Sequence, residues 1–355
     1  MDMAEDIRID SHKLIYHPER VARWLRGELI YPIEIEIGIS GACNHRCVFC
    51  AVDYMGYQPR MLDADVLMRN LEVLGKKGLK SVIYAGEGEP LLHPSAPDIF
   101  VRTKAAGIDV AASTNGVLFT RAKLEACLQS LTWVRYSIAG ATDATYEKIH
   151  QCAPGDLQRA LANMAEAVEV KCARGLGVTL GAQLLLLPEN KDEVVTLAKT
   201  VRDIGFDYLT VKPFSQHPQS KAKLTVDYSE SLEIQREVMT CETEGFKVYF
   251  RTQAIENLVH EKPYTRCHGL CFMSYMDSGG DMYPCCVLMG RPDFSYGNIY
   301  EDDIGKIWES TRAQEIRALF DGDRIRRECR EACRLDEINK YLDALKRPGA
   351  HVNFI

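Results

Sequence analysis

No run of apolar residues in this 355-residue chain approaches the length that a membrane-spanning helix needs. The longest apolar run, around Leu184 to Leu187, has the length of a strand. The first ten residues, MDMAEDIRID, are acidic and polar, so they do not resemble a secretory signal. These absences predict a cytoplasmic protein with no membrane partner.

The chain also lacks an excess of positive charge. Lys and Arg total 43 against 50 Asp and Glu, which gives a formal net charge of −7. This balance provides no field that would attract a DNA or RNA backbone, so nucleic acid is not an expected partner. The chain contains no internal repeat of solenoid period and no low-complexity tract, which excludes the repeat architectures.

Cysteine, by contrast, is unusually abundant, with 13 residues. The cysteines are unevenly placed, because three lie within 43–50 and six lie within 267–333. Without an export signal a disulfide framework is not expected, and clustered cysteines in a cytosolic protein indicate metal binding. The remaining cysteines stand singly and are expected to be buried thiols; they are Cys127, Cys152, Cys172 and Cys241.

Strand-like apolar runs alternate with amphipathic stretches over residues 31–213. This alternation predicts an α/β fold of parallel βα units, forming a partial (β/α)6 TIM-like barrel with its functional residues at the carboxyl ends of the strands. The predicted strands are 33–39, 81–84, 108–112, 133–138, 177–186 and 208–212, and the predicted helices are 63–77, 94–106, 120–130, 155–173 and 190–204.

Four segments follow from this pattern. Residues 1–30 form an N-terminal extension with a helix near Pro18 to Leu25, and residues 31–213 form the barrel. Residues 214–265 are predicted to be a polar linker or substrate loop with a helix at 228–244. Residues 266–355 form a small metal-stapled domain with a hairpin at SGGD and a closing helix at about 335–346.

The first cysteine group follows directly after the first strand, in SGACNHRCVFCAVDYMG. Cys43, Cys47 and Cys50 have the spacing CxxxCxxC, so three thiolates can converge on one inorganic cluster. A four-iron cube takes four ligands, and three protein ligands leave one iron open for a reacting molecule. A zinc site is the alternative; it would need a fourth ligand, for which His45 is the adjacent candidate.

This loop resembles the signature of the radical S-adenosylmethionine (SAM) superfamily, and the aromatic Phe49 before the last cysteine fits that signature. AGEGEPLLHP, after the second strand, is similar to the family's Gly-Glu-Pro motif. The resemblance implies a [4Fe–4S] cluster whose open iron binds SAM. It also implies reductive cleavage of SAM to a 5′-deoxyadenosyl radical, with the electron supplied by a reductant such as flavodoxin or ferredoxin.

The resemblance also assigns cofactor contacts at successive strand ends. It places Gly86, Gly88 and Glu89 at the methionyl end of SAM, where the carboxylate can take up the ammonium group. The other implied contacts are Ser113 and Asn115 in STNG, Ser137 in YSIAG, and Gln183 and Leu185 in GAQLLLL, the last two bordering ribose and adenine.

The second cysteine group, CHGLCFMSYMDSGGDMYPCC with the later RRECREACR, resembles the SPASM and twitch extensions found behind radical SAM barrels. Cys267, Gly280 and Cys285 match the opening spacing of these extensions. The resemblance implies an auxiliary [4Fe–4S] cluster held by Cys267, Cys285, Cys329 and Cys333. The last pair is CxxxC where the family more often has CxxC, so Cys271 could replace a member; a second auxiliary cluster and a zinc site also stay open.

Two further thiols, Cys286 and Cys271, are candidate catalytic residues because a thiol beside a cluster can donate a hydrogen atom to a substrate radical. Their alternative role is that of buried small apolar residues. Only about 30 residues precede the barrel, too few for a peptide-recognition domain. We therefore expect dehydrogenation or epimerisation of a small polar substrate, such as a sugar or an aminocyclitol. Candidate lining residues are Lys212, Ser215, Gln216, His217, Arg251 and Tyr275.

Two other functions are compatible with the same residues. A radical SAM maturase would modify a ribosomal peptide or a protein. A non-catalytic iron–sulfur electron carrier or a zinc-binding protein would use the cysteines without SAM chemistry.

Overall fold

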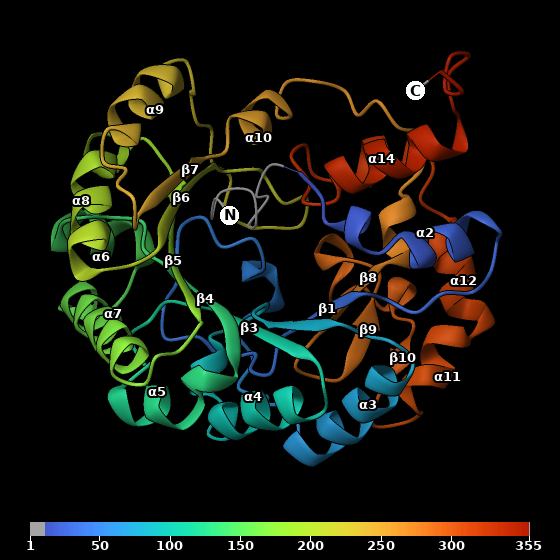
Figure 1. Cartoon of the computed structure of the whole chain (residues 1–355), viewed down its shortest axis with the longest axis horizontal. Coiled ribbons are helices and arrows are strands. Elements are labelled where there is room, and N and C mark those ends of the chain that lie inside the picture. The colour runs from blue at the N-terminus through green and yellow to red at the C-terminus, as the bar shows by residue number, and fades with distance from the viewer. Residues whose placement is uncertain (1–10, 355) are drawn as a thin grey trace.

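The computed structural model describes residues 11–354 and contains one strongly curved sheet of ten strands (Figure 1). The first ten residues, from which the absence of a secretory signal was predicted, lie outside the described residues. Among the residues that the structure describes, no helix combines the length and the apolar character needed to cross a membrane.

All six predicted strands are present, and consecutive strands pair in parallel. They are β1 (Glu34–Ile37), β2 (Ser81–Tyr84), β3 (Asp109–Thr114), β4 (Leu131–Ser137), β5 (Thr179–Leu186) and β6 (Tyr208–Pro213). Fully buried apolar side chains such as Ile35, Val82 and Leu180 fix the registers. The predicted α/β fold with a partial barrel is confirmed.

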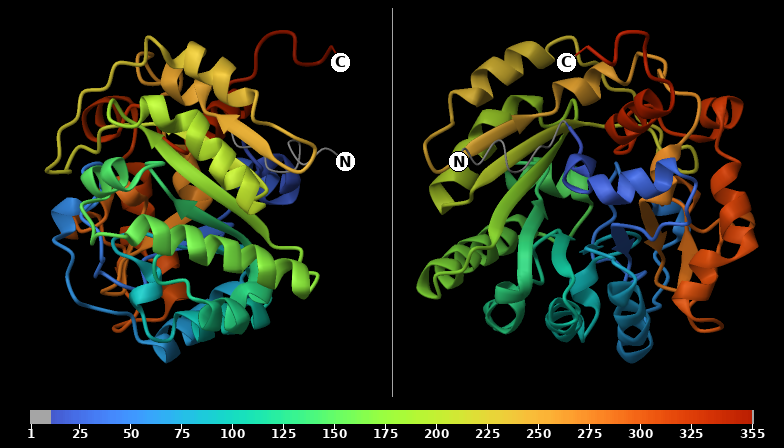
Figure 2. Two further views of the ribbon diagram at one scale, coloured as in Figure 1. Left: turned by 90° about the vertical axis from the view of Figure 1, so that its left-hand side faces the viewer. Right: turned by 45° about the vertical axis from the view of Figure 1, so that its right-hand side comes forward.

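Helices cover the outer face of the curved sheet (Figure 2). Those of the barrel are α3 (Ala64–Lys76), α4 (Ala96–Ala105), α5 (Arg121–Cys127), α6 (Asp143–His150), α7 (Asp156–Ala173) and α8 (Val194–Ile204). In α3, Asp63 caps the first turn by accepting hydrogen bonds from the amides of Asp65 and Val66, and buried leucines at 67, 71 and 74 form the inward stripe. The sequence prediction missed α6, which has only eight residues.

The prediction of a linker over residues 214–265 overlooked one strand. This segment contains β7 (Lys247–Phe250), which pairs in parallel with β6 and extends the barrel by a strand. The helix before it, α9 (Ser231–Met239), is shorter than predicted, and α10 (Thr252–Glu256) follows. The strand was missed because its four residues, KVYF, give too short a run for an alternating pattern to stand out.

The strands of the C-terminal region continue the sheet of the barrel. Of these, β8 (Met273–Met276) pairs in parallel with β1, while β9 (Asp281–Tyr283) and β10 (Gly297–Asn298) add antiparallel strands. The sheet order is β10-β9-β8-β1-β2-β3-β4-β5-β6-β7. The region's helices are α11 (Ile304–Glu309), α12 (Thr311–Ala318), α13 (Gly322–Glu328) and α14 (Asp336–Lys346).

The N-terminal extension packs on this C-terminal region. Its helix α2 (Pro18–Leu25) contributes Val21 and Trp24 to an apolar cluster with Phe272 and Leu342. Short 3-10 turns complete the structure, at Leu14–Tyr16, Asp53–Met55, Pro90–Leu92, Leu128–Ser130, Lys191–Glu193, His268–Cys271, Cys286–Leu288 and Pro292–Phe294.

A buried carboxylate joins the barrel to the C-terminal hairpin. Glu87, in the loop after β2, is 2% exposed and accepts hydrogen bonds from the Ser278 amide (2.9 Å) and hydroxyl (2.8 Å). Arg60 lies 3.3 Å from the same carboxylate and 3.1 Å from Asp277. The loop that carries the first cysteine group, through Arg60, therefore meets the C-terminal hairpin at one ionic junction.

Replacing Glu87 with Ala should destabilise the whole chain, because the Ser278 amide and Arg60 lose their acceptor inside the protein. We expect the free energy of unfolding to fall by about 3 kcal/mol. Urea denaturation of the anaerobically purified protein measures this loss. The control is Glu72→Ala at an exposed position on α3, which should change the free energy of unfolding by less than about 0.5 kcal/mol. Equal losses of unfolding free energy in both variants would contradict the assigned role of Glu87.

Candidate functional site

The first cysteine group lies in the loop between β1 and α3, at the carboxyl end of β1. Cys47 and Cys50 line a cavity of about 560 Å³ that opens over the inner face of the sheet. Burial raises the pKa of all three thiols, and Cys50 and Cys43 raise the pKa of Cys47 further, so the three sulfurs lie close together. Thiolates at this depth require a cation, which a metal cluster provides.

Each thiol of this group receives at least one hydrogen bond from the protein. The His45 amide lies 3.4 Å from Cys43 Sγ, His150 Nδ1 lies 3.2 Å from Cys47 Sγ, and the Tyr57 hydroxyl contacts Cys50. Hydrogen bonds to ligand sulfurs stabilise negative charge on them and are a means by which proteins set cluster reduction potentials.

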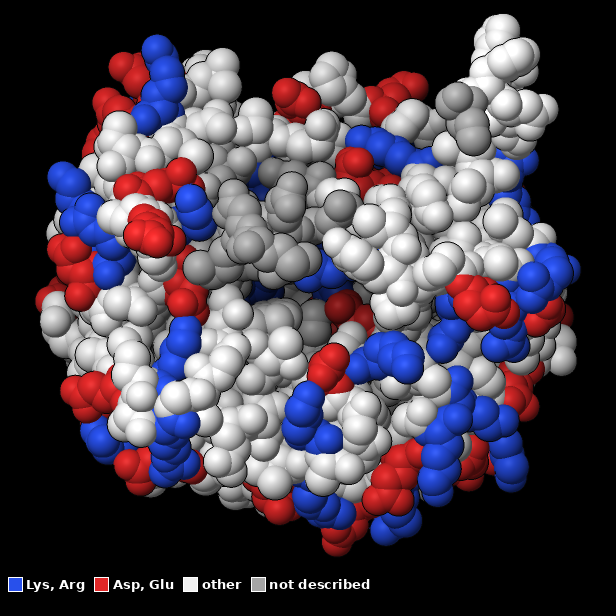
Figure 3. Space-filling model, in the orientation of Figure 1, with Lys and Arg blue, Asp and Glu red and all other residues white. Residues whose placement is uncertain are grey.

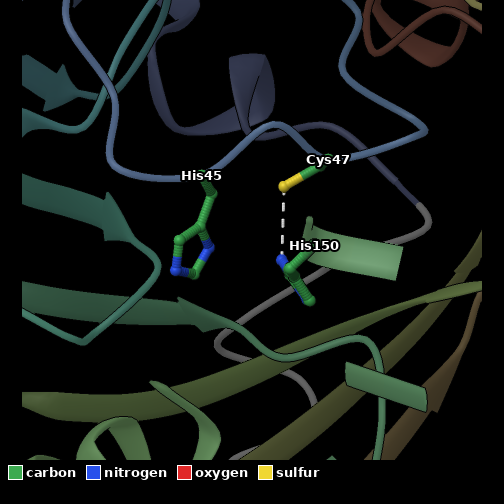
Figure 4. Close-up of side chains that lie close together, drawn as sticks. All are labelled: His45, Cys47 and His150. Carbon is green, nitrogen blue, oxygen red and sulfur yellow. Dashed lines mark hydrogen bonds between the residues drawn. The ribbon is translucent and has the colours of Figure 1, made fainter. Parts of the chain in front are cut away.

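His150 is a buried residue that the sequence prediction missed. Its Nε2 lies 3.0 Å from the Ala139 amide and accepts a hydrogen bond from it, so the ring proton is on Nδ1 and points at Cys47 (Figure 4). Neighbouring His45 is held by Asp156, with 3.2 Å between its Nε2 and the carboxylate. His150 is the last residue of α6, and no motif in the sequence marks it.

The geometry of the loop disfavours a single zinc ion. A tetrahedral ion with Zn–S bonds of about 2.3 Å needs sulfurs roughly 4 Å apart. Among residues 11–354, the potential ligand groups within 4.8 Å of one another include His45, Cys47 and His150, but not the three loop cysteines together. A ring nitrogen of His45 is already hydrogen-bonded to Asp156, and one of His150 to the Ala139 amide. Such hydrogen bonds are typical of residues that support a metal ligand. Three converging but wider-spaced sulfurs fit a cluster.

Five predicted SAM contacts line the cavity: Phe49, Gly86, Ser137, Gln183 and Leu185. Phe49 and Leu185 belong to an apolar cluster with Ala139 and Phe214, which offers a flat base a dry surface. Gly86 has a φ of +107°, and a Cβ there would lie 3.2 Å from Gly38 Cα, so only glycine allows the loop to approach β1 this closely.

The other four predicted SAM contacts do not line that cavity. Glu89 accepts hydrogen bonds from Thr114 Oγ1 (2.6 Å) and from the amides of Asn115 (2.8 Å) and Leu91 (3.1 Å), so its carboxylate holds strand ends together instead of facing the cavity. Asn115 donates to Asn44 Oδ1 at 2.8 Å. Ser113 lies on β3, outside the cavity lining.

Gly88 explains how the loop after β2 supports the cysteine loop. A Cβ at Gly88 would lie 2.2 Å from the carbonyl oxygen of Ala42 and 2.4 Å from that of Ser40. The two backbones are therefore in direct contact, and the Glu89 amide donates to the Ala42 carbonyl at 2.8 Å. Gly88 and Glu89 position the cysteine loop.

The four predicted auxiliary ligands come together in the C-terminal region. The pKa of Cys285 is raised well above its ordinary value by burial and by neighbouring thiols that include Cys333 and Cys267, and Cys333 is hydrogen-bonded to Cys329. Asn339 Nδ2 donates to Cys267 Sγ at 3.3 Å.

The two candidate catalytic thiols are placed differently. Cys286 lines the cavity, together with Cys333. Cys271 does not line it; it is hydrogen-bonded to Trp24 and packs against the N-terminal apolar cluster. This position outside the cavity lining favours the alternative role of Cys271 as a buried packing residue over that of a hydrogen-atom donor.

The predicted substrate-lining residues are mostly in place. The cavity lining contains Lys212, Ser215, His217, Arg251 and Tyr275. Gln216 does not line the cavity, and its side-chain Nε2 donates to the backbone carbonyls of His217 (2.9 Å) and Ala222 (3.0 Å). The cavity lining also contains charged residues that the sequence prediction missed, namely Glu36, Arg135, Arg330, Arg334, Asp336 and Glu337. The sequence could have indicated Arg135, because it precedes the predicted SAM contact Ser137 by two residues and so lies on the same inner face of β4.

Family models match both halves of this arrangement. The radical SAM superfamily model matches residues 37–201, which include the first cysteine group. The model of SPASM, an iron–sulfur cluster-binding domain, matches residues 267–334, which include the four auxiliary cysteines.

Two curated proteins illustrate the sequence similarity. A GTP 3′,8-cyclase of Chlorobaculum tepidum is 29% identical over 52% of this chain and 54% of its own length, so the chain spans about half of that relative. The tungsten-containing aldehyde ferredoxin oxidoreductase cofactor-modifying protein of Pyrococcus furiosus is 23% identical over 77% of this chain and 80% of its own.

Solved structures share the fold. Streptococcus suis SuiB bound to S-adenosylmethionine has a TM-score of 0.65 and 17% identity, covering 86% of this chain and 72% of its own. Native anSMEcpe with bound AdoMet has a TM-score of 0.58 and 15% identity, covering 91% of this chain and 100% of its own.

Gly88→Ala should impair assembly of the first metal centre, because the added Cβ forces the Ala42 carbonyl and the cysteine loop apart. We expect iron bound after anaerobic reconstitution to fall to roughly half or less of the wild-type content. Gly245→Ala is the matched control, since nothing lies within 4 Å of a Cβ there. Full iron loading of the Gly88 variant would show that the contact does not support the loop.

His150 variants should change the reduction potential of the centre that Cys47 binds. His150→Gln keeps an acceptor near Nε2 for the Ala139 amide but loses the donor to Cys47, whereas His150→Asn places an amide nitrogen near the Nδ1 position. We expect a more negative midpoint potential in the Gln variant and a near wild-type value in the Asn variant, measured by EPR-monitored titration. The same potential in all three proteins would contradict a role for the N–H···S bond.

Proposed function

Because the chain belongs to the radical SAM superfamily and carries a SPASM domain, we propose that it is an enzyme that dehydrogenates or epimerises a small polar molecule. The cluster and SAM supply the chemistry when bound, by reductive cleavage to a 5′-deoxyadenosyl radical that takes a hydrogen atom from the substrate. The observation that carries the proposal is a single cavity whose lining contains residues of both cysteine groups, namely Cys47, Cys50, Cys286 and Cys333.

The cavity walls divide into parts with different tasks. The apolar surface of Phe49, Leu185 and Phe214 excludes water next to Cys47 and Cys50. Ser137 and Gln183, neighbours in the β4–β5 register, offer hydrogen bonds to hydroxyl groups beside that surface. A volume of about 560 Å³ suits SAM together with a small substrate.

Cys286 supports the epimerase form of the proposal. Its S–H can give a hydrogen atom to the substrate carbon radical from the face opposite to abstraction, which forms a C–H bond of inverted configuration and leaves a sulfur radical. One electron from a reductant such as ferredoxin or flavodoxin, and one proton, restore the thiol. In the dehydrogenase form the substrate radical would instead give an electron to the auxiliary cluster that Cys285 and Cys333 would help to hold, and a proton to water, and Cys286 is not consumed.

A peptide is the second candidate substrate, which would make the chain a maturase. Its support is the fold shared with SuiB, which has also been solved bound to its precursor peptide SuiA. The same cavity would then receive one side chain of the peptide.

SAM cleavage is the first test of the proposal. The reconstituted protein should form 5′-deoxyadenosine from SAM and dithionite, whereas Cys43→Ala should reduce the product to background because one cluster ligand is missing. Cys172→Ala, at an exposed cysteine, is the matched control and should retain the wild-type rate. An intact cluster that fails to cleave SAM would refute the proposal.

Deuterium transfer identifies the substrate class. We expect a deuterated small-molecule extract, and not a deuterated peptide fraction, to place deuterium in 5′-deoxyadenosine, as mass spectrometry would detect. Label from the peptide fraction alone would favour the maturase. With the active fraction, Cys286→Ala should abolish product formation by an epimerase, while Cys271→Ala, away from the cavity, should leave it unchanged.

A further inference from the structure

We propose that the inner wall of this cavity binds a phosphate group, so that the substrate is a phosphorylated small molecule. The inference rests on the proposed function and names its substrate class. Lys212 on β6, Arg135 on β4 and Arg330 between α13 and α14 form the wall, and all three line the cavity. Figure 3 shows Lys and Arg atoms inside the hollow over the sheet.

The first argument is that these cations have donors to spare. Within residues 11–354, Lys212 and Arg135 make no hydrogen bond or ion pair, and the buried Nε of Arg135 has no acceptor. Arg330 uses Nε and Nη2 on the Ser215 hydroxyl (3.2 Å) and carbonyl (2.7 Å), which leaves Nη1. Buried donors without acceptors are costly, and an oxyanion removes that cost when it binds.

The second argument is the charge balance. Three acids line the cavity, and each is already paired: Glu36 with Arg334, Asp336 with Lys262 and Glu337 with Lys340. Burial lowers the pKa of Lys212 to about 7, and the positive charges of Arg135, Arg330 and Arg251 contribute to this shift. A wall in which several positive charges repel one another favours a ligand with more than one negative charge.

These observations favour phosphate over a single carboxylate. A phosphate monoester carries about −1.5 to −2 charges near neutral pH and presents three acceptor oxygens. Arginine forks match phosphate oxygens in pairs, and a lysine adds a point charge.

The carboxylate of SAM is a less suitable occupant. Arg135 precedes Ser137 by two residues on the same face of β4, so it lies one layer deeper in the barrel than the strand end. The loop with Cys47 and Cys50 and the loop with Gly86, where the cluster-bound end of SAM belongs, lie at the strand ends instead. The wall is therefore placed for the part of the substrate that lies farther from the reacting carbon.

The test is isothermal titration of inorganic phosphate into the reconstituted holoenzyme with SAM present. We expect saturable binding that Arg135→Gln and Arg330→Gln each weaken by about tenfold or more, and that Arg135→Lys weakens less because it keeps the charge. Arg69→Gln, at an exposed arginine on α3, is the matched control and should bind as the wild type does. Iron content and circular dichroism verify that each variant is folded and loaded.

Three outcomes would overturn the inference. The first is that phosphate fails to bind the loaded wild-type protein. The second is that malonate binds as tightly as phosphate, which would assign the wall to carboxylates. The third is that phosphate binds only when SAM is left out, which would assign the wall to the methionyl group. A SAM-cleavage assay on the same wild-type sample distinguishes failure of this inference from failure of the proposed function. Cleavage without phosphate binding refutes only this inference, whereas loaded protein that cannot cleave SAM refutes the proposed function itself.

Discussion

The structure depends on holding three buried thiols toward one point from a loop that has little secondary structure of its own. Contacts from three different strand ends support this loop: Gly88 after β2 against its backbone, Asn115 after β3 on Asn44, and His150 after β4 on Cys47. Each support comes from a loop that the parallel sheet brings to the same edge. The sheet is therefore the scaffold that makes the cysteine spacing useful, and the loop alone would not keep its sulfurs converged.

The second constraint is the fixed relation between the two cysteine groups. Parallel pairing of β8 with β1 places the C-terminal cysteines beside the barrel through backbone hydrogen bonds, and the junction of Glu87, Ser278 and Arg60 locks the same boundary. A flexible linker would let the distance between the groups vary. One continuous sheet keeps Cys47 and Cys286 in the lining of one cavity, as the proposed function requires.

Local sequence patterns predicted what depends on neighbouring residues. Six strands, most helices and both cysteine groups follow from periodicity and spacing, and the four predicted auxiliary ligands are neighbours in the structure. The pairing of β8 with β1 joins residues more than 200 positions apart, and no local pattern encodes it. His150 was missed for the same reason, since its role exists only where the end of α6 meets the cysteine loop. A motif predicted that Glu89 contacts SAM, whereas in the structure its buried carboxylate accepts hydrogen bonds from Thr114 and Asn115 at the end of β3.

The charge of the cavity wall restricts the possible class of substrate more than the cavity volume does. An aminocyclitol with its amine protonated would enter a wall made of Lys212, Arg135 and Arg330, and like charges at this depth repel strongly because little water screens them. A neutral sugar would meet no such repulsion, yet it would leave the buried cations without a counter-charge and so gain little from them. A sugar phosphate satisfies both demands: its phosphate neutralises the wall, and its hydroxyl-bearing carbons extend toward Ser137, Gln183 and the cysteine loop. Binding energy from the phosphate, remote from the reacting carbon, then orients the C–H bond to be broken.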